Sequence, residues 1–342
     1  MRRGFKKLDF ALRKFSKVID SYIKEVLASF VDKKHQGLVK YHFLTGGKRL
    51  RPVLAIVSCR MLGGKTKDVL RQAAGLEILH NYTLIIDDII DNSTLRRGSP
   101  TVWSKFGRSI AECVSWAFAA SAFQAAAKVK RPAEVAELFA ESLKAVMDGE
   151  IMDILFEQSG REDEPYVVEN RYYKVTEKDY FMMVGGKTAH LFGTCCALGA
   201  MAAGASKKDL ASLRKYGFNL GLVFQIKDDI LDIFGKQETF GKVIGGDIVE
   251  RKLGNIVILK SFREFSSADK KNFLAILRKG KVTAKDVKKG IAMIAKTNSR
   301  KESDFLARGF LEKAKKELRG LPDNVWRGLL FKLADFVMDR EK

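Results

Sequence analysis

Apolar positions recur along the chain with a period near 3.6, which is the period of an α-helix. The pattern is clear in residues 5–30, 110–128 and 133–156. No stretch alternates apolar and polar residues for long enough to indicate a sheet. The 342 residues include five prolines and no linker rich in Gly, Ser or Pro. The sequence therefore predicts a single all-α domain covering residues 1–342.

Several helix starts can be read from capping signals. A Ser or Thr followed three residues later by an acidic residue is typical of a helix N-terminus. Such pairs include Thr176 with Asp179, Ser206 with Asp209, and Thr283 with Asp286. The helix after Ser206 is predicted to run to Phe234, because Gly235 follows. The segment from Lys236 to Gly254 loses the apolar period, which predicts a loop.

The most unusual polar residues are three aspartates in an apolar run. Residues 80–101 read HNYTLIIDDIIDNSTLRRGSPT and contain Asp87, Asp88 and Asp91. On a helix Asp87 and Asp91 share a face, with Asp88 about 100° around. Carboxylates this close stay ionised together only with a cation between them, and Mg²⁺ prefers such oxygen ligands. The stretch therefore predicts a magnesium site.

The same helix is predicted to continue from Leu70 to Arg97. Gly98 and Pro100 would stop it there, which places Arg96 and Arg97 in its last turn. Two guanidinium groups near the metal ligands would suit a phosphate group.

A second acidic cluster lies far downstream at Asp228, Asp229 and Asp232, again within apolar sequence. One cluster alone would fit a charged helix end. An EF-hand does not fit, because its loop needs ligands at alternate positions and a glycine at the sixth. Two embedded clusters are hard to explain as solvated surface and favour a metal-dependent site.

Basic residues stand where they could bind anions. Gly46-Gly47-Lys48-Arg49-Leu50-Arg51-Pro52 predicts a turn before a helix that begins at Pro52, and free N–H groups at a helix start favour anions. Lys187 and Thr188 interrupt an apolar helix but lack the spacing of a phosphate-binding P-loop. His80 would share the acidic face of its helix. A diphosphate ligand fits these elements together.

The formal net charge is +21. Nucleic acid, an anionic membrane surface and phosphorylated substrates would each suit such a charge. The excess is heaviest between residues 251 and 319, where few aromatic residues alternate with the cations. This argues against a nucleic-acid groove. We therefore expect no nucleic-acid partner and attribute the charge to solubility or weak association with a membrane surface.

The sequence also suggests a cellular setting. The opening residues MRRGFKKLDF lack the apolar core of a signal peptide. The longest apolar runs, near residues 114–127 and 193–205, are too short and too polar to span a bilayer. The four cysteines show neither metal nor disulfide spacing. A cytoplasmic location is expected.

Taken together, these motifs resemble the trans-isoprenyl diphosphate synthase family, the short-chain polyprenyl synthetases. The resemblance runs from the Gly-Gly-Lys-Arg-x-Arg-Pro element to the Leu-Ala-x-Phe-Val-x-x-Arg motif at Leu333–Arg340. It implies an all-α isoprenoid-synthase-like bundle around a deep central cavity, and a homodimer. The implied substrates are isopentenyl diphosphate and allylic diphosphates of C5 to C15. The implied reaction is ionisation of the allylic diphosphate, condensation and proton elimination.

The resemblance also implies a role for each matching residue. Three Mg²⁺ ions would bind at Asp87, Asp91, Asp228 and Asp232, supported by Asp88, Asp229 and Asp247. Isopentenyl diphosphate would be held by Lys48, Arg49, Arg51, His80 and Arg97, and the allylic diphosphate by Arg96, Lys187, Lys242 and Lys252. Thr188 and Gln225 would line the allylic carbocation, and Lys187, Asp88 and Asp229 are counted with them as catalytic. Cations aimed at the departing diphosphate lower the barrier to ionisation.

Three positions depart from the family pattern. Arg251 replaces a glycine and Gly254 a threonine, which bears on the placement of Lys252. Glu150 stands where glutamine is common, which would alter the polarity beside the carbocation.

Product length is predicted from Tyr82, five residues before Asp87 and about 7.5 Å along the helix axis. A bulky ring there could cap the cavity, while Thr83 leaves room; an ordinary core tyrosine is the alternative. The resemblance, which is to the archaeal-type pattern, implies geranylgeranyl diphosphate. The alternatives are farnesyl (C15) or geranylfarnesyl (C25) diphosphate.

Two other classes were weighed. Terpene cyclases share the first motif but replace the second with an Asn/Ser/Glu triad, whereas this chain keeps Asp228, Asp229 and Asp232. A non-catalytic, basic helical binding protein should have lost aspartates, which this chain has not. Chain elongation is favoured over both.

Overall fold

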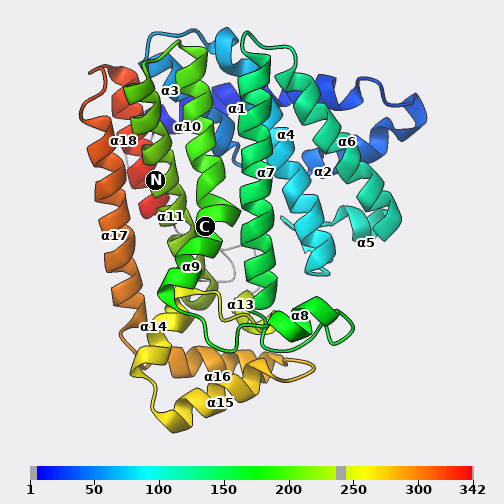
Figure 1. The fold of residues 1–342 in the computed structure, drawn as a ribbon, viewed down its shortest axis with the longest axis vertical. Helices are drawn as coiled ribbons and strands as arrows, with labels where there is room; N and C mark the ends of the chain where they lie inside the picture. Colours follow the sequence, from blue (N-terminus) through cyan, green and yellow to red (C-terminus); the bar gives the residue numbers. More distant parts are fainter. Residues whose placement is uncertain (1–5, 236–243, 341–342) are drawn as a thin grey trace. The chain divides into compact units, whose positions relative to one another are not determined.

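The computed structural model describes residues 6–235 and 244–340, and nearly all regular structure in these ranges is helical (Figure 1). The exception is a ribbon of two short antiparallel strands. The predicted all-α fold is confirmed. In chain order the elements are α1 (Lys6–Ala28), η2 (Lys33–His35), α2 (Gln36–Leu44), α3 (Leu50–Met61), α4 (Thr66–Ile90), β1 (Leu95–Arg96), β2 (Ser99–Pro100), α5 (Val102–Phe106), α6 (Arg108–Ala126), α7 (Pro132–Leu155), α8 (Pro165–Asn170), α9 (Glu177–Val184), η3 (Gly185–Ala189), α10 (His190–Ala202), α11 (Lys207–Phe234), α13 (Gly246–Val249), α14 (Ile256–Glu264), α15 (Ser267–Leu277), α16 (Ala284–Ile294), α17 (Ser299–Leu318) and α18 (Val325–Met338).

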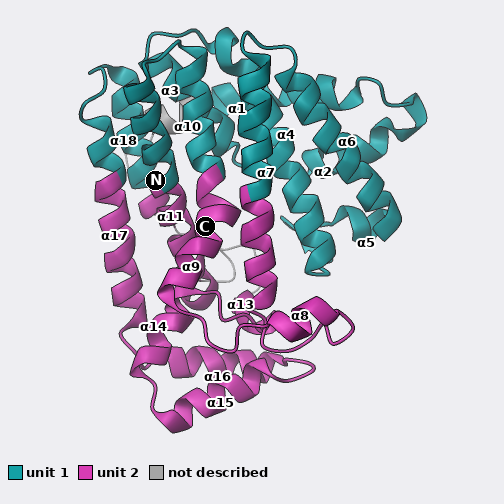
Figure 2. Ribbon diagram, viewed as in Figure 1, with its two compact units in different colours: residues 1–144, 191–218, 314–336 teal, residues 145–190, 219–313, 337–342 magenta. Residues whose placement is uncertain are grey.

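The chain divides into two compact units, each assembled from separate segments (Figure 2). Unit 1 comprises residues 1–144, 191–218 and 314–336, and unit 2 comprises residues 145–190, 219–313 and 337–342. The predicted single domain stays a prediction. None of the helices in the described ranges is long and apolar enough to cross a membrane.

In unit 1 the long helix α4 packs along α3 and α6. Small residues allow these helices to approach closely. A Cβ atom at Gly75 of α4 would lie 3.0 Å from the ring of Phe139 and 3.1 Å from the side chain of Ala125. At Gly199 of α10 it would lie 2.7 Å from the side chain of Ser58 in α3. Larger residues at these two positions would push apart the helices that carry the basic loop and the first aspartate cluster.

In unit 2 the turn η3 is a π-helical turn between α9 and α10, and it carries Lys187 and Thr188. Single π turns inside helices are frequent at functional sites, because the extra residue re-aims neighbouring side chains. The turn lies against α7, where a Cβ atom at Gly149 would overlap the backbone of Lys187. Glycine at position 149 is therefore what lets α7 approach this turn.

The predicted N-caps are confirmed. The side chain of Thr176 accepts from the N–H of Asp179, and Thr283 does the same for Asp286, each completing a capping box. Ser206 likewise accepts from the N–H of Asp209, before a helix that ends at Phe234 as predicted.

The predicted end of the first aspartate helix was wrong. Helix α4 ends at Ile90, and residues 95–100 form the strand ribbon rather than a last helical turn. The chain turns because Asn92 and Arg97 adopt left-handed backbone angles, with φ of 53° and 54°. Asparagine tolerates this conformation well. Pro52 is also the third residue of α3, not the first.

The segment between Lys236 and Gly254 was predicted to be a loop. Residues 236–243 lie outside the described residues. The remainder contains the short helix α13, which begins after a left-handed Gly245 with φ of 76°. The prediction therefore missed one helical turn.

Candidate active site

The predicted site residues are divided between the two units. Unit 1 carries the basic loop at Lys48–Arg51, His80, Tyr82, Thr83, the first aspartate cluster, Arg96 and Arg97. Unit 2 carries Lys187, Thr188, Gln225, the second aspartate cluster, Asp247 and Lys252. Lys242 lies outside the described residues. Each half is described below by itself.

The first aspartate cluster is bound by an arginine from the ribbon. Arg96 donates from one terminal nitrogen to Asp87 and from Nε to Asp88, both at 2.7 Å. The ribbon thus brings Arg96 back onto the helix end, which a continuous helix would not have done. Burial raises the pKa of Asp88 to about 6, against the opposing pull of Arg96. At neutral pH the carboxyl group of Asp88 is therefore still mostly ionised.

The basic loop divides its cations between different tasks. Lys48 is exposed, whereas Arg49 is buried. Arg49 pairs with Asp20 at 2.8 Å and with Glu77 at 3.3 Å, and its guanidinium lies 3.9 Å from the centre of the Phe43 ring. It also donates to two backbone carbonyls of the same region. These contacts hold the guanidinium of Arg49 against other residues of unit 1.

Arg51 and His80 form a pair. A terminal nitrogen of Arg51 lies 2.9 Å from His80 Nε2, and the guanidinium lies over the ring of Phe192. Burial, together with the charges of Arg51 and Arg97, holds the pKa of His80 well below its usual range. The imidazole is therefore neutral, and its Nε2 accepts from Arg51. No described residue accepts from His80 Nδ1 or Arg51 Nε, although both are buried.

Arg97 completes this half. Its guanidinium donates to the carbonyl of Gly46 and so links the ribbon to the glycine turn. The side chain of Arg97 is otherwise exposed. Thr83 donates to the carbonyl of His80 at 2.8 Å, and Tyr82 is half-buried on the same helix.

In unit 2 Asp229 is the centre of a hydrogen-bond network. It accepts from Tyr180 Oη at 2.8 Å, from Gln225 Nε2 at 2.9 Å and from the N–H of Ile256 at 3.0 Å. Thr188 donates to Gln225 Oε1 at 2.9 Å, which extends the network to the π turn. Burial, reinforced by Asp247, raises the pKa of Asp229 to about 8.

Tyr180 was missed by the sequence reasoning. It is completely buried and orients Asp229, yet in the sequence it looks like any aromatic of an apolar helix. The available signal was its spacing. Tyr180 precedes Lys187 by seven residues, about two helical turns.

The other two aspartates of the second cluster have different partners. Asp228 forms an ion pair with Arg340, whose guanidinium lies 3.8 Å from the centre of the Phe224 ring. Asp232 accepts from the N–H groups of Gly246 at 2.8 Å and Asp247 at 3.3 Å. Burial and the charge of Asp247 hold the pKa of Asp232 well above its usual range.

The two lysines of unit 2 share one carboxylate. Asp153 accepts from Lys187 at 2.7 Å and from Lys252 at 2.9 Å. Lys187 also pairs with Glu150 at 2.8 Å, and Lys252 with Glu250 at 3.0 Å. Burial alone would raise the pKa of Asp153, but the two lysines hold it well below its usual range. Asp153 was not among the predicted site residues.

The departures around Lys252 have local explanations. Arg251 adopts a left-handed backbone with φ of 64°, where a glycine would be unstrained. Its guanidinium donates to the carbonyl of Gly280 at 3.1 Å. At Gly254 a Cβ atom would lie 2.9 Å from the ring of Phe156, so a threonine would not fit without a shift.

The carboxylate oxygens of the two aspartate clusters are the type of ligand that magnesium prefers. The described residues bring no group of three or more His, Cys, Asp or Glu side chains around one point. Mg²⁺ usually takes one or two carboxylates and fills its shell with water and phosphate oxygens. Asp88 Oδ2 is buried and accepts no hydrogen bond from the described residues, which leaves one hard oxygen donor in the first cluster.

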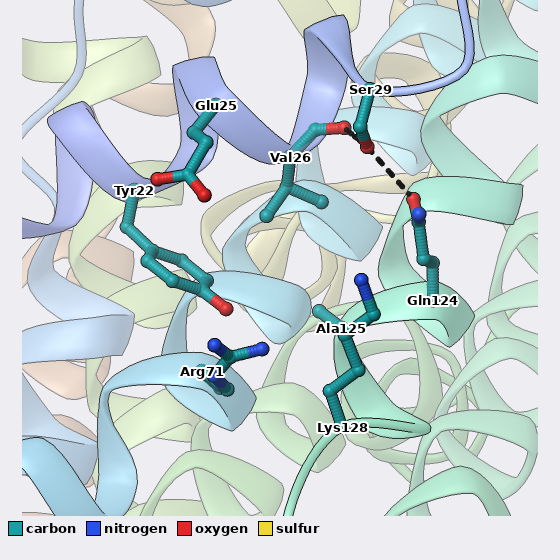
Figure 3. A pocket seen from close by; sticks show the side chains of 8 residues that line it. All are labelled: Tyr22, Glu25, Val26, Ser29, Arg71, Gln124, Ala125 and Lys128. Atoms are coloured by element: carbon teal, nitrogen blue, oxygen red, sulfur yellow. Dashed lines mark hydrogen bonds between the residues drawn. The ribbon is translucent and has the colours of Figure 1, made fainter.

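A separate cavity of about 100 Å³ lies in unit 1 and contains no predicted site residue (Figure 3). Tyr22 and Glu25 of α1 face Arg71 of α4 across it, and Ser29 donates to Gln124 at 3.1 Å. Its two cations and one carboxylate are exposed and leave a net charge of only +1, so the cavity does not indicate a diphosphate site.

The motifs and the fold define a class of protein. The sequence profile of the polyprenyl synthetase family matches residues 32–294, and the chain belongs to that family. Its members are prenyltransferases, and this chain is an enzyme of isoprenoid synthesis.

Individual relatives narrow the comparison. A geranylgeranyl diphosphate synthase of Saccharolobus solfataricus is 35% identical over 308 residues, covering 88% of each chain. The crystal structure of a geranylgeranyl pyrophosphate synthetase from Pyrococcus horikoshii has a TM-score of 0.86 at 29% identity, covering 98% of this chain and 100% of that one. A polyprenyl synthase of Caulobacter crescentus, complexed with calcium and isoprenyl diphosphate, has a TM-score of 0.84 at 27% identity, covering 99% and 97%.

Proposed function

We propose that this protein condenses isopentenyl diphosphate with allylic diphosphates and releases geranylgeranyl diphosphate. The observation that carries the proposal is the pairing of cations with carboxylates in both units. Arg96 binds Asp87 and Asp88, while Lys187 and Lys252 share Asp153. Such a set of cations and hard oxygen donors suits diphosphate and divalent metal together.

The allylic diphosphate is the leaving group. Arg96, Lys187 and Lys252 are proposed to bind it and to stay in place as negative charge develops during ionisation, so that no reorganisation is needed at that moment. Mg²⁺, held by Asp87, Asp91, Asp228 and Asp232, would supply Lewis-acid stabilisation of the same leaving group when bound. Three ions are proposed by resemblance. The relative complexed with calcium supports a divalent cation beside an isoprenyl diphosphate.

The carbocation needs oxygen lone pairs and protection from water. Thr188 and Gln225 are proposed to line it, and their mutual hydrogen bond at 2.9 Å keeps both side chains in one orientation. Tyr180 acts one step further away, because it fixes Asp229, which in turn holds Gln225.

Isopentenyl diphosphate is assigned to the basic half of unit 1. Lys48 and Arg97 are exposed, and Arg51 and neutral His80 each retain a buried nitrogen that no described residue uses. These four are proposed as its ligands. We assign Arg49 a different task, which is to hold the glycine turn in place through Glu77 and Asp20.

The length of the product is assigned from Tyr82 and from relatives that make this product by name. Incubating the enzyme with isopentenyl diphosphate and C5, C10 or C15 primers, followed by mass analysis, tests the proposal. Accumulation of the C20 diphosphate is expected. A C15 or C25 end point would replace the product assignment, and cyclised hydrocarbon made without isopentenyl diphosphate would replace the reaction.

We also propose that the enzyme is a homodimer. Helix α6 of unit 1 exposes Ile110, Cys113 and Trp116 at three-residue spacing, and Trp116 is 69% exposed. Exposed apolar residues on one helix face mark an interaction surface. Sedimentation equilibrium should give twice the chain mass, and Trp116→Ser should shift the equilibrium toward monomer.

A further inference from the structure

The strongest positive charge of the chain is concentrated in a part of unit 2 that carries no predicted catalytic residue. Residues 266–301 contain eleven Lys and Arg residues and two Asp residues. This segment comprises α15, α16 and the start of α17, and Figure 1 shows α15 and α16 side by side, with the chain then passing into α17. A net charge of +9 in 36 residues is far above an even share of +21 in 342.

The two acidic residues of this segment are engaged within it. Asp269 accepts from Ser266 at the start of α15. Asp286 accepts from Lys279 at 2.5 Å and from Thr283, as part of the cap of α16. Neither carboxylate is therefore directed at the remaining lysines.

Helix α16 has two contrasting faces. Val287, Gly290 and Ile294 are buried, and a Cβ atom at Gly290 would lie 3.1 Å from Ile248. The opposite face exposes Lys285, Lys288 and Lys289, which follow a helical repeat over about 6 Å of axis. Lys296 is also exposed and lies in the turn just after the helix ends at Ile294. None of the four pairs with a carboxylate in the described part of the chain.

Helix α17, which follows α16 in the chain, adds further exposed cations and an exposed apolar residue. Phe305 is 80% exposed. Lys301 and Arg308 stand four and three residues away, on the same helix face, and both are exposed. The neighbouring acidic side chains point elsewhere, since Glu302 pairs with Lys260 and Asp304 with Lys227.

We propose that this basic surface, which comprises Lys285, Lys288, Lys289, Lys296, Lys301 and Arg308 together with the exposed Phe305, docks the enzyme on an anionic lipid bilayer. Lysines along a helix with an exposed phenylalanine are the pattern of an interfacial helix, in which cations meet headgroups and the ring enters the headgroup boundary.

Lipid fits better than nucleic acid. Single-stranded nucleic acid is bound by several aromatic rings interleaved with cations. Here Phe262, Phe265 and Phe273 pack on one another instead, with ring centres 5.5–5.8 Å apart. A bilayer also suits the product, since a twenty-carbon tail leaves water for lipid by the hydrophobic effect. This last argument rests on the proposed function.

Vesicle co-sedimentation tests the proposal. The full chain is mixed with phosphatidylcholine vesicles, with or without phosphatidylglycerol, at physiological salt. Binding is expected only with the anionic lipid. Because each surface lysine contributes about fivefold to such binding, Lys285→Glu/Lys288→Glu/Lys289→Glu should weaken it more than about 100-fold. Phe305→Ala should weaken it severalfold with no change in charge.

Matched variants elsewhere separate a specific surface from total charge. The charge control replaces three exposed lysines of unit 1 in the variant Lys128→Glu/Lys207→Glu/Lys208→Glu, which should leave vesicle binding nearly intact. The apolar control is Val325→Ala, at a side chain that is 79% exposed, and it should also leave binding nearly intact. The proposal would be overturned if both triple lysine variants lost binding equally or if the wild type did not bind. Tighter binding to an RNA oligonucleotide than to anionic vesicles would overturn it as well. Prenyl transfer in vesicle-free solution should be unchanged in every variant. A wild type without prenyl transfer would contradict the proposed function and leave the vesicle result to stand by itself.

Discussion

Arg49 offers the sharpest test of which basic residues bind ligand and which hold the structure. Its side chain is 2% exposed and lies between Glu77, 5% exposed, and Asp20, 35% exposed. In Arg49→Leu the carboxylate of Asp20 can return to water. Glu77 cannot, and it keeps only a long hydrogen bond of 3.4 Å from Asn81.

The expected loss of stability follows from this difference in exposure between Asp20 and Glu77. Removing one partner of a buried ion pair lowers the free energy of unfolding by about 3–5 kcal/mol, because the other charge stays buried. Unfolding entropy is about 2 cal/mol/K per residue, so the loss should lower the Tm by about 4–7 °C. Removing both partners in Arg49→Leu/Glu77→Leu should recover at least half of it, since the buried carboxylate of Glu77 is then no longer left without Arg49.

The effect should depend on pH. Burial raises the pKa of Glu77, and Arg49 is the strongest of the groups that lower it again. Without Arg49 the folded-state pKa rises further above the unfolded value of 4.5. The folded variant then binds more protons than the unfolded chain, so its stability falls as pH rises through this interval. The deficit relative to wild type should be small near pH 4.5 and larger at pH 7.

Thermal and urea unfolding of wild type, Arg49→Leu, the double variant and Arg60→Leu would check this reasoning. Arg60 lies on the same helix over the ring of Trp326 and leaves no buried carboxylate behind, so its loss should be small. The reasoning is refuted if Arg49→Leu unfolds like the wild type. It is equally refuted if the variant's main effect is a large rise in the KM for isopentenyl diphosphate, because Arg49 would then be a ligand residue.

Three further outcomes are expected. Asp87→Ala and Asp228→Ala should each lower kcat about 10³-fold, or about 4 kcal/mol of barrier, without unfolding the protein, and near-normal turnover in EDTA would contradict this. Tyr82→Ala should lengthen the products seen by mass analysis; an unchanged distribution means that Tyr82 does not set the end point. Glu150→Gln frees Lys187 from one of its two carboxylates and should lower the KM for the allylic diphosphate by about fivefold, whereas Glu141→Gln on the same helix, whose partner Arg214 is exposed, should have no effect.

Local signals in the sequence predicted much of the helical framework. The caps at Thr176 and Thr283 depend on residues three apart, and apolar periodicity fixes which helix face is buried, so both are encoded within one or two turns. The position of each aspartate cluster on its own helix followed from the same kind of information, since each cluster is contiguous, whereas a shared metal site was implied only by the family resemblance.

Features that depend on tertiary structure could not be read in this way. The end of α4 at Ile90 depends on left-handed angles at Asn92 and Arg97 and on the return of Arg96 to Asp87. None of these leaves a mark in apolar periodicity, so the helix was predicted to be too long. Arg49 likewise looked equivalent to its basic neighbours, because its partners lie 28 and 29 residues away.

Polar residues buried at the site were the hardest to recognise. Tyr180 and Asp153 reach their partners 49 and 34 or more residues away in the sequence. A tyrosine in an apolar helix and an aspartate near a helix end are common in any protein. Their importance comes from burial, since a buried carboxylate must find donors or a counter-charge, and here the helices supply three donors to Asp229 and two lysines to Asp153.

The need of a buried carboxylate for a counter-charge also couples the binding of cations and anions at the proposed site. Arg96 can turn to a diphosphate only by releasing Asp87 or Asp88, and Arg340 holds Asp228 in the same manner. A carboxylate that loses its arginine needs another cation, and a partly buried one needs it most. When diphosphate and divalent metal bind at these residues as proposed, each should therefore lower the cost of binding the other. Because such coupling is reciprocal, each ligand should raise the affinity for the other by the same factor.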